Sequence, residues 1–121
     1  MRYLIDGMNV IGSRPDGWWR DREGAMAALV ESLRRLAAGR DQVTVVFERA
    51  PRGPIEAGAV SVLHAPSPGR DAADDEIVRL LEADQDPGGL TVVTSDRELA
   101  GRARALGAAV EPARAFRRRI E

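Results

Sequence analysis

Short apolar runs alternate with longer amphipathic segments along the whole chain. The apolar runs are typical of strands and occupy residues 2–6, 43–47, 60–64, 90–94 and 109–111. Apolar side chains recur at helical spacing in the segments between them, at residues 22–38, 71–83 and 97–106, and a last helical stretch begins at Ala113. Strands that alternate with helices predict βαβ units and a mainly parallel sheet. We therefore expect one α/β domain spanning residues 1–121.

Glycines and the strength of the apolar runs refine this prediction. Gly39 and Gly107 follow the helices 22–38 and 97–106, where glycine commonly ends a helix. The run 90–94 is apolar enough to be a central strand covered on both faces.

Acidic residues stand where the apolar runs end. Asp6 closes the first run, Glu48 follows the second, and Asp96 follows the run 90–94. Asp74 lies in the first turn of the helix predicted for residues 71–83. In an open parallel sheet the carboxyl ends of the strands meet at one edge, and ligands bind there. Carboxylates without histidine or cysteine partners select hard cations, so this edge predicts a site for Mg²⁺ or Mn²⁺.

Each acid also has a purely structural interpretation. Asp6 and Asn9 could hold the turn after the first strand through side-chain to backbone bonds. Asp74 and Asp75 could be first-turn acids of a helix whose N-cap is Asp71. Taken one at a time, these interpretations stay open.

The segment 95–98 has its own structural alternative. Ser95 and Glu98 have the spacing of a capping box, with Ser95 as the N-cap, and Asp96 would then suit the helix dipole. Glu48 could simply be solvated at the end of its strand.

Composition limits the chemistry. All 18 basic residues are arginine, and the net charge is −1. Guanidinium groups suit bidentate contacts with phosphate. The absence of cysteine excludes disulfides and thiolate metal sites. No apolar stretch approaches the ~20 residues that span a bilayer, so we expect a cytoplasmic protein with no membrane partner. His64, the only histidine, has no pattern of a nucleophilic Ser–His pair around it.

Two adjacent tryptophans lie among arginines in the loop after the first strand. Nucleic-acid bases stack on aromatic side chains for roughly 1–3 kcal/mol each, and the neighbouring arginines would hold the nucleic-acid backbone. The alternative is that at least one tryptophan packs over the first helix. The residues that this pattern predicts for binding nucleic acid are Arg14, Trp18, Trp19, Arg20 and Arg22, together with Arg97 beside Asp96.

Three blocks of the sequence match a known family in order and spacing. Residues 6–11, 73–77 and 93–99 read DGMNVI, ADDEI and VTSDREL. They resemble the NYN domain of the YacP-like branch of PIN-domain ribonucleases. The resemblance implies a three-layer α/β/α sandwich with strand order 3-2-1-4-5. It also implies Mg²⁺- or Mn²⁺-dependent cleavage of RNA phosphodiesters by an endoribonuclease, with RNA such as mRNA, rRNA or ribosome-associated RNA as partner.

Carried over by position, the resemblance assigns roles to individual residues. Asp6, Asp74 and Asp96 would bind metal and carry catalysis, and Asp74 is favoured over Asp75 because it falls three residues before Ile77. The chain has Met8 where the family usually has an aromatic residue. The residues that would support the site are Asn9, Glu48, Asp75 and Ser95.

Other protein classes that place acids at the carboxyl edge of a sheet fit this sequence less well. Phosphotransfer receivers, haloacid-dehalogenase-type phosphatases and Walker-loop proteins need a lysine, and this chain has none. Two alternatives remain open: an RNA-binding PIN-like module with weak or no catalysis, and a toxin-type PIN nuclease held by a protein antitoxin. The sequence leaves the oligomeric state open.

Overall fold

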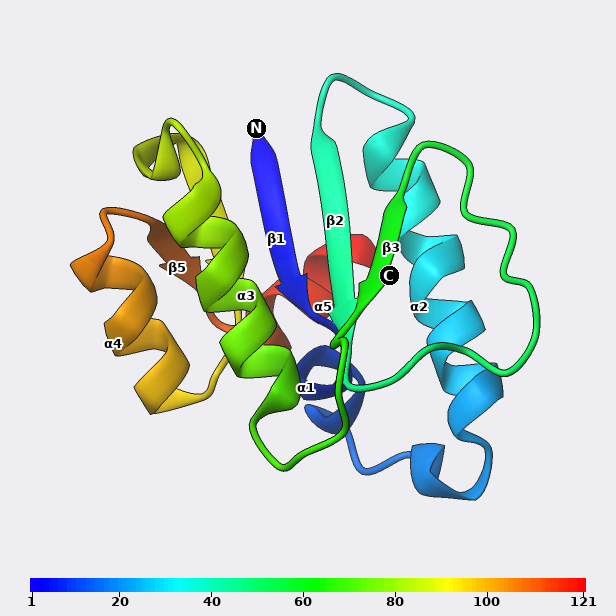
Figure 1. The fold of residues 1–121 in the computed structure, drawn as a ribbon. Coiled ribbons are helices and arrows are strands. Elements are labelled where there is room, and N and C mark those ends of the chain that lie inside the picture. The colour runs from blue at the N-terminus through cyan, green and yellow to red at the C-terminus, as the bar shows by residue number, and fades with distance from the viewer.

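A computed structural model describes residues 1–121 and has a five-stranded, wholly parallel sheet at its centre. The strands lie in the order β3-β2-β1-β4-β5 (Figure 1). Their bounds are β1 Arg2–Asp6, β2 Gln42–Phe47, β3 Ser61–His64, β4 Leu90–Val93 and β5 Ala109–Glu111. The α/β class, the parallel sheet and the strand order expected from the sequence are confirmed. β4 pairs with both β1 and β5, and all four of its residues are buried, as predicted for a central strand.

Helices connect the strands and cover both faces of the sheet. Three of them begin and end within about two residues of their predicted positions, and α5 begins at the predicted Ala113. Two short 3₁₀ turns occupy Trp18–Arg20 and Pro87–Gly89. The helices are α1 Gly7–Gly12, α2 Arg22–Ala37, α3 Ala72–Ala83, α4 Arg97–Ala105 and α5 Ala113–Ile120. None of them has both the length and the apolarity that a membrane-spanning helix requires.

The sequence did not predict α1, which starts directly after β1. Its six residues are too few to show a helical period, and only Val10 and Ile11 supply large buried side chains. Gly7 is required here for space, because a Cβ at this position would lie 2.6 Å from the ring of Phe47. The loop predicted after the first strand is therefore a helical turn pressed against β2.

One prediction about helix ends is confirmed and one is wrong. Gly107 has a φ of +95° and follows α4, as expected for a left-handed cap. Gly39 does not take a positive φ, and the residue that caps α2 is Ala38, in right-handed backbone.

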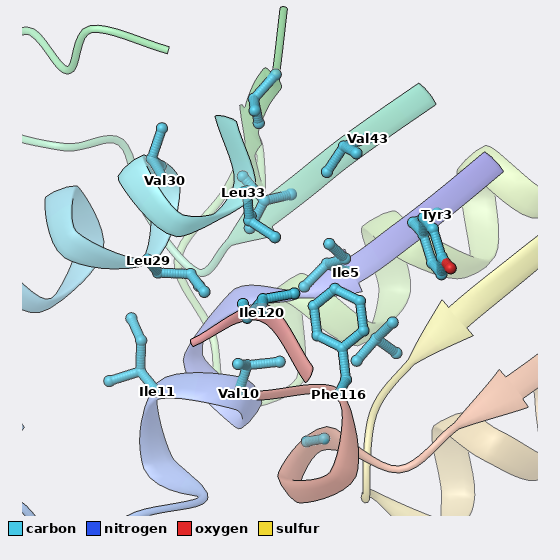
Figure 2. Packing of buried hydrophobic residues seen from close by; sticks show 14 of the residues in the cluster. Tyr3, Ile5, Val10, Ile11, Leu29, Val30, Leu33, Val43, Phe116 and Ile120 are labelled. Carbon is cyan, nitrogen blue, oxygen red and sulfur yellow. The ribbon is translucent and has the colours of Figure 1, made fainter. Parts of the chain in front are cut away.

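Two hydrophobic clusters hold the layers together. Helices α1, α2 and α5 cover one face of the sheet, where Phe116 and Ile120 meet Ile5 and Leu33 (Figure 2). Helices α3 and α4 cover the other face through Ile77, Leu81 and Leu99. On the first face, Arg117 of α5 donates to the carbonyl oxygens of Val10 and Ile11 at 3.3 and 2.8 Å. These bonds join the end of α1 to α5.

Because every strand runs in the same direction, all five carboxyl ends lie at one edge of the sheet. The segments that leave this edge lead into α1, α3, α4 and α5 (Figure 1). The acids that the sequence places after β1 and β4, and at the start of α3, are thereby brought to the same edge.

Candidate active site

A cavity of about 390 Å³ opens at the carboxyl edge, and we call it the acid cavity. Five carboxylates line it, and none of them forms an ion pair with a basic side chain. Its lining consists of Asp6, Met8, Asn9, Trp18, Arg22, Glu48, Arg70, Asp71, Ala73, Asp74 and Asp96. The three acids predicted as catalytic therefore share one cavity with Asn9 and Glu48.

Asp6 is the most buried acid of the cavity. It is the last residue of β1, and only 5% of its surface is exposed. The hydroxyl of Thr94, which is 1% exposed, donates to Asp6 Oδ2 at 3.0 Å. Burial, then repulsion from Asp74, raises the pKa of Asp6 to about 7, against the opposing effect of the Thr94 hydrogen bond.

Asp96 caps α4, and the same threonine holds its backbone. Asp96 Oδ1 accepts a hydrogen bond from the backbone N–H of Leu99 at 2.8 Å. The backbone N–H of Asp96 donates to Thr94 Oγ1 at 3.1 Å. One buried hydroxyl thus links the carboxylate at the end of β1 to the start of α4.

Ser95 is not the N-cap that the capping-box pattern predicted. The helix starts one residue later, so Asp96 takes the capping position. Ser95 instead donates its backbone N–H to Asn9 Oδ1 at 2.8 Å, and its Oγ accepts from the backbone N–H of Ala113 at 2.9 Å. Ser95 therefore joins α1 and α5 at the edge without lining the acid cavity itself.

The first turn of α3 separates its two adjacent aspartates. Asp74 is half-buried and lines the cavity, whereas Asp75 is exposed and pairs with Arg102 at 3.2 Å. Burial, then repulsion from Asp96, raises the pKa of Asp74 to about 6. Of this pair, only Asp74 lines the cavity with the other acids.

Aromatic and basic side chains border the acids. Trp18 lines the cavity and also packs against the core, while Trp19 is 51% exposed and meets Trp18 edge-on. The guanidinium of Arg22 lies 5.2 Å from the centre of the Trp18 ring. Arg20 and Arg97 are exposed. Arg14 lies outside the cavity lining and pairs with Glu121 at 2.7 Å.

Sequence reasoning missed two residues of this site. Thr94 belongs to the run 90–94, where a threonine indicates only a strand residue. Its position two residues before Asp96 is the one sequence feature that could have pointed to a role beside that acid. Asp71 was recognised only as a helix cap, and the structure also places it on the cavity wall. His64 is exposed, and its Nδ1 lies 2.9 Å from the carbonyl oxygen of Ala65.

The donor chemistry of the acid cavity fits a hard divalent cation. All candidate ligands are carboxylate or amide oxygens. Burial, and after it repulsion from neighbouring acids, raises the pKa of Asp6 and of Asp74, and a bound cation would relieve that repulsion. The side-chain positions are not those of a finished metal site, since no group of three or more His, Cys, Asp or Glu side chains is arranged to hold an ion.

Comparison with known proteins places the chain in a family. The model of the YacP-like NYN domain matches residues 3–121. The chain belongs to the YacP-like NYN family. It is thus a member of a PIN-like nuclease family, and the resemblance seen in the sequence is confirmed.

Solved structures share the fold of this YacP-like NYN domain. Rae1 (YacP) from Bacillus subtilis superposes with a TM-score of 0.79 at 22% identity, covering 99% of this chain and 73% of the other. A tryptophan-to-leucine variant of the same protein gives a TM-score of 0.77 at 23% identity, covering 99% and 74%. No curated protein matches the chain.

Proposed function

We propose that this YacP-like NYN domain is a divalent-metal-dependent ribonuclease that hydrolyses RNA phosphodiester bonds at the acid cavity. The observation that carries the proposal is that Asp6, Asp74 and Asp96 line one cavity in a member of a nuclease family. In this proposal the three carboxylates would hold Mg²⁺ or Mn²⁺. The bound cation would lower the pKa of a water molecule and offset charge on the phosphate oxygens.

The protein's own residues prepare the site for this chemistry. Thr94 holds the Asp6 carboxylate in one orientation and fixes the backbone of Asp96, so two of the three acids are positioned by one buried hydroxyl. Asn9 uses its Oδ1 to bind the backbone of Ser95, which leaves its amide group free to donate to a phosphate oxygen. Glu48 supplies a further carboxylate at the rim.

The surroundings of the cavity support an RNA substrate. Trp18 forms part of the wall and Trp19 is exposed beside it, so both are available for contact with unpaired bases. Arg22 lies on the same wall, Arg20 precedes it in the exposed loop, and Arg97 follows Asp96 directly. Arg14 contributes less in this proposal, because Glu121 already neutralises its charge.

The position of the cavity also favours cleavage within an RNA chain over cleavage at its end. Strands β2 and β3 lie on one side of β1, and β4 and β5 lie on the other, so the edge continues in both directions from the acids. An RNA strand could therefore extend past the cavity at both ends, as an endoribonuclease requires.

A cleavage assay tests this function. Unstructured and structured RNAs are incubated with the protein in Mg²⁺, in Mn²⁺ and in EDTA. We expect cleavage only with metal, and we expect Asp6→Asn, Asp74→Asn and Asp96→Asn to abolish or strongly reduce it. Asp75→Asn is the matched control, since that carboxylate lies outside the cavity and pairs with Arg102. Equal cleavage by wild type and Asp96→Asn would refute the assignment, and RNA binding without cleavage would indicate a binding module instead.

A further inference from the structure

A second cavity adjoins the acid cavity at Trp18. It has a volume of about 360 Å³ and opens between α1, α2 and α5, the three helices that cover one face of the sheet. Trp18 lines both cavities, and no other residue is shared between them. We call this hollow the second cavity. It is separate from the candidate active site but has one wall in common with it.

Large apolar side chains form the floor of the second cavity. They are Val10 and Ile11 of α1, Leu29 of α2 and Ile120 of α5, and all four are buried in the core (Figure 2). Helix α2 adds only the small side chains of Ala25, Ala28 and Ser32 to the wall, which leaves the space above the floor unfilled. An apolar group of a ligand would cover this floor and remove apolar surface from water.

The one basic side chain of the lining is already engaged within the protein. Arg117 Nη1 donates to the carbonyl oxygens of Val10 and Ile11 at 3.3 and 2.8 Å. Its Nη2 donates to Asp16 at 2.9 Å, and its Nε donates to Glu121 at 3.1 Å. Because every nitrogen of this guanidinium has a partner, an anionic ligand would have to displace existing bonds.

Three carboxylates border the second cavity, and one of them has no basic partner. Asp16 pairs with Arg117, and Glu121 pairs with Arg117 and with Arg14 at 2.7 Å. Asp21 forms no ion pair: its Oδ1 caps α2, and its Oδ2 has no hydrogen-bond partner in the protein. Two arginines thus balance two of the three acids. A single positive charge on a ligand would balance the third.

We propose that the second cavity binds a small organic amine, with the apolar body of the amine on the floor and its ammonium group on the Asp21 carboxylate. Ligand sites of this size combine a mostly apolar lining with a few placed polar groups, and the lining here has that composition. The body of the amine also contacts Trp18, the wall shared with the acid cavity. This site requires neither a metal nor RNA cleavage, so its test is independent of the proposed function.

Tryptophan fluorescence measures binding at the shared wall. The chain has two tryptophans, and Trp19→Phe leaves Trp18 as the only reporter. In EDTA and without RNA, 2-phenylethylamine should change the Trp18 emission in a saturable way, with a Kd of about 1 mM or lower. 3-Phenylpropionate carries the opposite charge on a similar body and should not bind. Propylamine lacks the ring and should bind about tenfold more weakly or less. No response to 2-phenylethylamine, or an equal response to 3-phenylpropionate, would overturn the proposal.

Substitutions in the Trp19→Phe protein locate the bound amine. Ala28→Phe fills the cavity and should abolish binding, whereas Ala27→Phe is the matched control, because Ala27 is also exposed on α2 but lies outside the lining. Asp21→Asn keeps a good helix-capping residue but removes the charge, and it should weaken binding about fivefold. Glu31→Gln removes an exposed carboxylate of α2 that lies outside the lining, and it should leave the Kd unchanged.

The acid cavity is the competing location for a cation. Asp74→Asn removes one of its carboxylates and should leave the Kd for 2-phenylethylamine unchanged. Binding that is lost in Asp74→Asn but kept in Ala28→Phe would place the amine in the acid cavity and overturn the proposal. Equal losses in Ala27→Phe and Ala28→Phe would also overturn it. Circular dichroism checks that each variant is folded, and if Ala28→Phe is not, equal Kd values for Asp21→Asn and Glu31→Gln would refute the site.

Discussion

The charge on Asp6 should make the metal-free protein less stable as the pH rises. Asp6 is 5% exposed, and its pKa in the folded protein is about 7, against an ordinary value of 3.8. Between these two values the folded state binds more protons than the unfolded state. The free energy of unfolding therefore falls with increasing pH across this window, and the loss is complete above the folded-state pKa.

The size of the effect follows from the pKa shift. Each pKa unit corresponds to about 1.4 kcal/mol, and the interval from pH 5 to the folded-state pKa of about 7 covers two units. Asp6 alone should therefore lower the free energy of unfolding by about 3 kcal/mol between pH 5 and pH 8. Asparagine at this position keeps an oxygen that can accept the Thr94 hydrogen bond but carries no charge. Asp6→Asn should remove this part of the pH dependence and be more stable than wild type at pH 8.

Urea unfolding in EDTA at pH 5 and pH 8 measures the difference directly. Wild type, Asp6→Asn and the control Asp75→Asn are compared, and the control should retain the wild-type dependence because its carboxylate lies outside the cavity. If Asp6→Asn loses as much stability between pH 5 and pH 8 as wild type does, then Asp6 is not the buried charge that the structure indicates.

Two further predictions concern how the acids are held and what relieves their repulsion. Thr94→Val should lower RNA cleavage by about 10–100-fold, because the hydroxyl positions both Asp6 and Asp96. Thr94→Ser keeps the hydroxyl and should retain most of the activity. Similar activity in the two variants would rule out this positioning role. In EDTA, Asp74→Asn should be as stable as wild type or more stable. Mn²⁺ at a hundredfold excess over its Kd should stabilise wild type by about 2.7 kcal/mol, and the variant should lose most of this gain. Thermal unfolding with EDTA and with Mn²⁺ checks this, and a mutant that is destabilised in EDTA but keeps its Mn²⁺ response would show that Asp74 serves only the start of α3.

The sequence by itself determined the class of fold and the edge at which the acids lie. Apolar runs and helical periods are local patterns, so the strands and the four longer helices could be placed within a few residues. Once the strands are parallel, residues such as Asp6 and Asp96 that follow them must reach the same edge, whatever the details of packing. Helix α1 escaped prediction because its six residues are too few to show a period, and its position depends on the contact of Gly7 with Phe47.

Only the tertiary structure decided how the acids are held and which of them meet. The spacing to Ile77 favoured Asp74 over Asp75, but only the packing of α3 on the sheet brings Asp74 to the cavity while Asp75 reaches Arg102. The role of Thr94 needs two chain segments 88 residues apart to lie within hydrogen-bonding distance. The raised pKa of Asp6 likewise depends on burial and on the charge of Asp74, both of which arise only when the layers pack. Burial and long-range contacts are properties of the folded chain, and no local pattern of residues encodes them.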